Sequence, residues 1–149
     1  MARSRWSQPL VDIAVAGAFL AIGWVASNAA TTTDPDFVYT PRDSLFVLLL
    51  VLATVPYAWR RHRPGTVFVV TLVSTTALWA LGYNGSALPM FLLVGAYFVA
   101  STCRPRQVAV CGAVALGCFA FLWWADGAPY GVTEVAASVV GVAGAMGLG

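Results

Sequence analysis

The stretch LLLVLATVPYAWRRHRP, residues 48–64, decides how this chain is organised. It is an apolar run that ends in three arginines and a histidine, after which Pro64 opens a second apolar run. Proline suits the first turn of a helix because its missing N–H would have no hydrogen-bond partner there. The stretch therefore predicts the end of one apolar helix, a tight basic turn and the start of the next helix.

The composition indicates that such apolar runs lie in a membrane. Of the 149 residues, 60% are hydrophobic and only 9% are charged, with 8 arginines, no lysine and 6 acidic residues. Soluble domains carry about 25% charged residues, so this chain has too few charges to cover a soluble surface. The sequence predicts an all-α, integral membrane bundle that fills residues 1–149 as one domain. Its six transmembrane helices are expected at about 9–29, 41–59, 64–82, 87–103, 105–125 and 132–149.

Prolines set the expected boundaries of these helices. Four spans begin with a proline: Pro9, Pro41, Pro64 and Pro105. Thr40 and Asp43, on either side of Pro41, are expected to cap the second span. Pro56 lies inside that span and removes a backbone hydrogen bond, so it is expected to bend the helix one turn before its end.

The arginines predict the orientation of the bundle. If the N-terminus lies inside, the inner segments hold every arginine except Arg42: Arg3, Arg5, Arg60, Arg61, Arg63, Arg104 and Arg106. The positive-inside rule then places both termini in the cytoplasm. Arg60, Arg61, Arg63, Arg104 and Arg106 are expected to face lipid and to attract anionic headgroups. A cleaved signal peptide ending near Ala29 is the alternative for the first span, but Asp12 within its apolar run argues against cleavage.

The sequence offers few candidates for chemistry. Asp12 and Glu134 are the only acids within spans, and an ionisable group in a membrane can be functional. Both are expected in the first turn of a helix, where the helix dipole and headgroup water favour a carboxylate, so we favour a structural role. His62 is expected to be a solvated residue of the inner loop. Three cysteines without metal-ligand spacing are expected to be small hydrophobic residues: Cys103, Cys111 and Cys118.

No nucleophile with a base, phosphate loop or metal motif occurs, so the sequence predicts no catalytic residue, cofactor or metal. The net charge of +2 is small and scattered, which argues against a nucleic-acid partner. The expected partner is the lipid bilayer with its anionic headgroups.

Helix packing has clearer signals. Small residues recur at every fourth position of the sixth span, at Ala137, Gly141 and Ala145, and predict a close contact with another helix. The sequence leaves open whether that helix belongs to the same chain or to a second one. The third span carries three polar residues expected to donate hydrogen bonds between helices: Thr71, Ser74 and Thr75.

The quoted stretch, the Gly-Tyr-Asn-Gly turn at residues 82–85 and LLVGAYFVASTCRPR at residues 92–106 resemble the N-terminal membrane region of bacterial sensor histidine kinases. The resemblance covers nearly the whole chain. In that family a dimerisation helix with a phospho-accepting histidine and an ATP-binding domain follow the last span, and neither is present here. His62 does not match the phospho-acceptor, so the resemblance carries no catalytic residue into this chain. The all-arginine basic set would suit a GC-rich bacterial genome.

The resemblance implies a membrane-embedded sensor, input and anchoring module of a two-component signal-transduction system in the bacterial cytoplasmic membrane. It further implies a homodimer in the full-length receptor, with a response regulator reached only through the missing kinase core. No basic residue follows the last span, which predicts that this chain is an input module cut from, or degenerated from, a longer signalling protein. The alternative is a stand-alone membrane scaffold or a transporter-associated subunit.

Overall fold

The computed structural model describes residues 7–29, 39–85 and 87–124, together with Gly141 and Gly144. The regular secondary structure of this part is helical, with no strand, so the all-α prediction is confirmed there. The helices are α1 (Ser7–Ala29), α2 (Ser44–Thr54), the 3-10 helix η1 (Val55–Trp59), α3 (Pro64–Ala80), α4 (Leu88–Thr102) and α5 (Pro105–Trp124). Most of the predicted sixth span, including Glu134, Ala137 and Ala145, lies outside the described residues.

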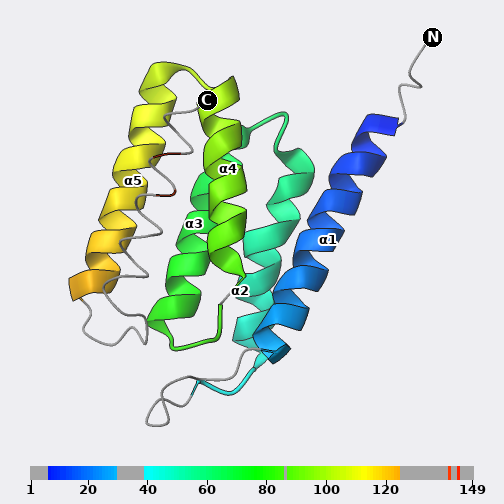
Figure 1. Cartoon of the computed structure of the whole chain (residues 1–149), viewed down its shortest axis with the longest axis vertical. Coiled ribbons are helices and arrows are strands. Elements are labelled where there is room, and N and C mark those ends of the chain that lie inside the picture. Colours follow the sequence, from blue (N-terminus) through cyan, green and yellow to red (C-terminus); the bar gives the residue numbers. More distant parts are fainter. Residues whose placement is uncertain (1–6, 30–38, 86, 125–140, 142–143, 145–149) are drawn as a thin grey trace.

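The helices α1 to α5 run in alternating directions, with η1 continuing α2 (Figure 1). The start of α1, the η1–α3 turn and the α4–α5 turn therefore gather at one end of the bundle, uppermost in Figure 1. We call it the arginine end, because it carries Arg60, Arg61, Arg63, Arg104 and Arg106. Helix α3 lies at the centre, in contact with α2, η1, α4 and α5, whereas α1 packs on α2 and η1.

The helix starts follow the prolines only in part. Helices α3 and α5 begin at Pro64 and Pro105 as predicted. The predicted start at Pro41 is wrong, because α2 begins at Ser44 after its N-cap Asp43, whose side chain accepts a hydrogen bond from the Phe46 amide at 2.9 Å. Thr40 does not cap α2; its hydroxyl donates to the Leu81 carbonyl at 2.7 Å.

Pro56 coincides with a change of helix type. The α-helical geometry of α2 ends at Thr54, and the chain tightens into η1, with Pro56 as its second residue. Thr54 donates from its hydroxyl to the Leu50 carbonyl at 2.8 Å. A proline cannot donate the next α-helical hydrogen bond, which explains why the α-helix stops at this point.

The core contains polar as well as aromatic side chains. Phe46, Tyr57, Phe68 and Phe91 are almost completely buried. Thr71 of α3 donates from its hydroxyl to the Ala53 carbonyl at 3.0 Å, which confirms it as an interhelical donor. Ser74 and Thr75 are also buried, but the Thr75 hydroxyl has no hydrogen-bond partner among the described residues.

The outer surface of the bundle is apolar. Large hydrophobic side chains are exposed along α1 and α5, including Leu10 at 66%, Val110 at 62% and Leu116 at 61%. Two described helices are long and apolar enough to cross a membrane, Gln8–Asn28 and Pro105–Leu122, whereas the other apolar helices are shorter.

Gly141 provides a test of the packing expected for the predicted sixth span. A Cβ on Gly141 would lie 2.9 Å from Cδ2 of Leu93 in α4, so the neighbour of this glycine belongs to the same chain. We expect Gly141→Leu to destabilise the detergent-solubilised protein by about 1–3 kcal/mol, because the larger side chain overfills this contact. Gly144→Leu is the matched control, since no atom lies within 4 Å of a Cβ there. Equal melting temperatures of the two variants would contradict the prediction.

Candidate functional site

A cluster of three charged residues, two of them buried, joins α1 to the arginine end. Arg60 Nη2 lies 2.8 Å from Oδ1 of Asp12, and Arg61 Nε lies 2.9 Å from Oδ2 of the same carboxylate. The Asp12 side chain is 8% exposed and that of Arg60 is 9% exposed, whereas Arg61 is 48% exposed. Two arginines share one carboxylate, so the cluster keeps one net positive charge.

The surroundings of Arg60 correct the expectation that it faces lipid. Its guanidinium carbon lies 5.0 Å from the centre of the Phe98 ring of α4, and the aromatic face stabilises the cation. The Nε atom of Arg60 is buried without a hydrogen-bond partner among the described residues. The charge of this arginine is therefore stabilised inside the bundle, by the Asp12 carboxylate and by the aromatic ring.

Asp12 also differs from its sequence interpretation. Helix α1 begins at Ser7, two residues before Pro9, so Asp12 lies in the second turn and the helix has no acid in its first turn. Its carboxylate is held by two arginines instead of the helix dipole. The sequence contained one signal for this pairing. Asp12 is the single acid in the first apolar run, and Arg60 and Arg61 lie at the same end of the next run.

The other candidate residues lie apart from this cluster or at its edge. The basic residues Arg63, Arg104 and Arg106 are exposed at the arginine end, and His62 is exposed beside Arg61. Cys111 is buried, whereas Cys103 and Cys118 are half-buried, and all three are free thiols. Residues 7–29, 39–85 and 87–124, with Gly141 and Gly144, contain no group of three or more side chains that could hold a metal ion.

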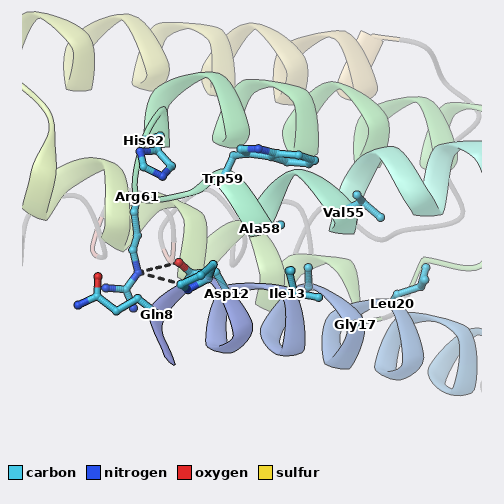
Figure 2. A pocket seen from close by; sticks show the side chains of 12 residues that line it. Gln8, Asp12, Ile13, Gly17, Leu20, Val55, Ala58, Trp59, Arg61 and His62 are labelled. Atoms are coloured by element: carbon cyan, nitrogen blue, oxygen red, sulfur yellow. Dashed lines mark hydrogen bonds and ion pairs between the residues drawn. The ribbon is translucent and has the colours of Figure 1, made fainter. Parts of the chain in front are cut away.

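A groove of about 840 Å³ lies next to the charged cluster, between α1 and η1. Polar side chains, among them Arg61 and His62, stand at one end of this α1–η1 groove (Figure 2). Apolar residues such as Leu20 and Val55 line the other end. The full lining consists of Gln8, Pro9, Asp12, Ile13, Ala16, Gly17, Leu20, Val55, Ala58, Trp59, Arg61 and His62.

A second polar cluster connects neighbouring segments at the opposite end of the bundle. Arg42 donates to the Asn28 side chain and to the Ser27 carbonyl near the end of α1, where a cation complements the helix dipole. Tyr83 donates from its hydroxyl to Oδ1 of Asp43 at 2.7 Å. This hydrogen bond raises the pKa of the Tyr83 hydroxyl, because deprotonation would break it and place a second negative charge beside the carboxylate.

The double role of Asp43 predicts a measurable loss of stability on truncation. We expect Asp43→Ala to lower the free energy of unfolding by about 1 kcal/mol, because the first turn of α2 loses its N-cap. Asp43→Asn keeps a side-chain oxygen that can accept from the Phe46 amide, so it should cost less. Thermal unfolding in detergent compares the two variants. An equal loss for both would show that the carboxylate charge matters more than the cap.

Comparison with known proteins places the chain in a family. No curated protein and no solved structure matches it. The model of a family described as a domain of unknown function, DUF7134, matches residues 1–148, which is almost the whole chain. The chain therefore belongs to the DUF7134 family.

Proposed function

We propose that this chain is the membrane-embedded input and anchoring module of a two-component sensor histidine kinase. In this proposal the chain crosses the bacterial cytoplasmic membrane six times, with both termini and the arginine end in the cytoplasm. The full-length receptor is a homodimer, and its kinase core passes the signal to a response regulator. The observation that carries the proposal is the ion-pair cluster of the buried Asp12 and Arg60 with the half-exposed Arg61, at the arginine end of an apolar bundle.

The surface of the bundle supports the membrane placement. In a membrane, the exposed leucine and valine side chains on α1 and α5 would contact lipid tails. This contact would keep the apolar surface of the bundle out of water. The exposed Arg61, Arg63 and Arg104 lie at one end, where the positive-inside rule places the cytoplasm. Helices α2 and α3 are short for a bilayer of about 30 Å, a mismatch that local thinning and snorkelling arginines accommodate.

The ion pairs support a signalling role because they couple helices at the end nearest the cytoplasm. Asp12 belongs to α1, and Arg60 and Arg61 follow η1, so the salt bridges hold these two elements in one arrangement. An input that separates them exposes charge to the interface and disturbs the packing of Arg60 on the Phe98 ring. Such a rearrangement has discrete states and can move a helix that leads into a cytoplasmic domain.

The connections at the opposite end favour a stimulus that is read within the membrane. The α3–α4 connection is short, and the Thr40 amide donates to the carbonyl of Gly82 in this connection at 3.0 Å. This connection is far shorter than a ligand-binding domain. The helices themselves, with the surrounding lipid, are then the sensing element.

A chimeric kinase tests the proposal. A histidine-kinase core is fused in frame after Gly149, the protein is reconstituted in vesicles, and autophosphorylation from labelled ATP is measured as the lipid composition changes. We expect the wild-type fusion to respond and Arg61→Gln to alter both the basal rate and the response. Arg63→Gln is the matched control, because it removes the same charge from the same turn without breaking an ion pair.

The opposite result would contradict the proposal. If autophosphorylation is the same in every lipid and in both variants, the bundle is an anchor without input function. The alternative of a stand-alone scaffold or transporter-associated subunit would then replace the proposal.

A further inference from the structure

We propose that the α1–η1 groove binds one acidic phospholipid from the surrounding bilayer, with the phosphate at Arg61 and an acyl chain along the apolar wall. This inference rests on the membrane placement given under the proposed function. It goes beyond general attraction of headgroups to arginines, because it assigns one lipid to one groove.

The lining of the groove has the polarity of a phospholipid. Gln8, Arg61 and His62 offer hydrogen-bond donors at one end, and Leu20 and Val55 form an apolar surface at the other (Figure 2). The polar end coincides with the arginine end of the bundle, which the proposed topology places at the headgroup level. The apolar end then points toward the middle of the bilayer, as the acyl chain of a lipid does.

The length of the groove fits one leaflet. At a rise of about 1.5 Å per residue, the α1 wall from Gln8 to Leu20 is about 18 Å long. One leaflet contributes about half of a hydrocarbon thickness of about 30 Å. An acyl chain lying along Ile13 and Gly17 would therefore run from the headgroup level to the bilayer centre. The volume of about 840 Å³ is within the usual range of ligand sites.

The charge at the polar end selects an anionic headgroup. Asp12 accepts a hydrogen bond from Nη2 of the buried Arg60, and it engages the half-exposed Arg61 only through Nε. The two terminal nitrogens of Arg61 make no hydrogen bond to any described residue, and half of the side chain is exposed. Phosphate oxygens match the paired N–H groups of a guanidinium. A zwitterionic lipid would bring its own cation to this net positive site and bind less well.

Small residues keep the groove open. Three small residues line it, Ala16 and Gly17 of α1 and Ala58 of η1, and they add little side-chain volume there. A Cβ on Gly17 would meet no atom within 4 Å. A larger side chain at this position therefore occupies the groove without a clash inside the bundle, which makes Gly17 the position at which to block it.

Native mass spectrometry of the full chain released from detergent tests the site. The protein is incubated with phosphatidylglycerol or with phosphatidylcholine of the same acyl chains, and the bound lipid is counted. We expect one retained phosphatidylglycerol, held about tenfold more tightly than phosphatidylcholine. Gly17→Leu should abolish this retention. Gly117→Leu is the matched control on α5, because it too is exposed and has no atom within 4 Å of a Cβ.

The variant Arg61→Gln distinguishes binding of the headgroup from binding of the acyl chain. This variant should bind both lipids with the same low affinity, about tenfold below wild-type binding of phosphatidylglycerol. Glycerol phosphate, which has the phosphate but no acyl chain, should fail to displace the lipid. Equal retention of the two lipids by the wild type, retention by Gly17→Leu equal to that of Gly117→Leu, or displacement by glycerol phosphate would each overturn the proposal.

The outcome is independent of signalling. Lipid retention is measured on the chain without a kinase core. If the groove retains no lipid but the chimeric kinase still responds, the lipid site is wrong and the proposed function stands. A bound phosphatidylglycerol with an unresponsive chimera would instead establish the lipid site on a scaffold.

Discussion

Asp12→Ala is expected to destabilise the protein by about 3–5 kcal/mol, the largest effect of any single substitution considered for this chain. The variant leaves Arg60 buried beside Phe98 with no carboxylate to neutralise it. Breaking a buried ion pair by removing one partner costs this much because an uncompensated charge remains in a medium of low dielectric constant. Chemical denaturation in detergent, followed by circular dichroism, measures the loss.

A double variant distinguishes this explanation from a simple packing defect. Asp12→Leu combined with Arg60→Leu removes both buried charges, and it should be markedly more stable than Asp12→Ala because apolar replacements of an ion pair are often tolerated. Arg63→Ala is the control for loss of an exposed arginine in the same turn. A loss below about 1 kcal/mol for Asp12→Ala would contradict the ion-pair assignment.

Gly95→Ala is expected to cost about 1–3 kcal/mol through overpacking. A Cβ on Gly95 of α4 would lie 2.7 Å from the Tyr57 hydroxyl and 3.0 Å from Cδ2 of Phe68. The tyrosine cannot move away easily, because it is fully buried, donates to the Phe91 carbonyl and packs edge-on against the Phe19 ring. The close approach of η1 to α4 therefore requires glycine at this position.

Tyr57→Phe provides the partner for a double-mutant cycle. It removes the hydroxyl, the atom nearest the added methyl group, so Gly95→Ala should cost less in the Tyr57→Phe background than in the wild type. Gly117→Ala is the control, and it should be neutral or slightly stabilising because its Cβ meets open space and alanine favours helix. Equal costs of Gly95→Ala in both backgrounds would show that the hydroxyl is not the obstacle.

Most of the helical segments in the described part could be predicted from the sequence. Apolar runs and helix-starting prolines are local signals, and Pro64 and Pro105 mark the helix starts correctly. The start of α2 was missed because Thr40, which resembles a cap in sequence, is used instead for a tertiary hydrogen bond to Leu81. A competing partner that is distant in the chain has no local sequence signal.

The candidate site could not be predicted in the same way. The hydropathy pattern places Asp12 near one end of a span, but it contains no information on which helices become neighbours. The ion pairs depend on the packing of α1 against η1, as does the groove. The Tyr57–Gly95 contact likewise depends on the packing of η1 against α4. Residue types predicted the apolar helices and the basic turns, whereas the pairing and the groove required the three-dimensional arrangement.

The central claim is a membrane bundle with its arginine end in the cytoplasm, and cysteine labelling in bacterial cells tests it most directly. The three native cysteines are replaced by alanine, and single cysteines are introduced as Thr33→Cys, between α1 and α2, and His62→Cys, in the η1–α3 turn. A membrane-impermeant maleimide should label Thr33→Cys in intact spheroplasts and His62→Cys only after lysis. Labelling of His62→Cys in intact spheroplasts, with protection of Thr33→Cys, would contradict the account.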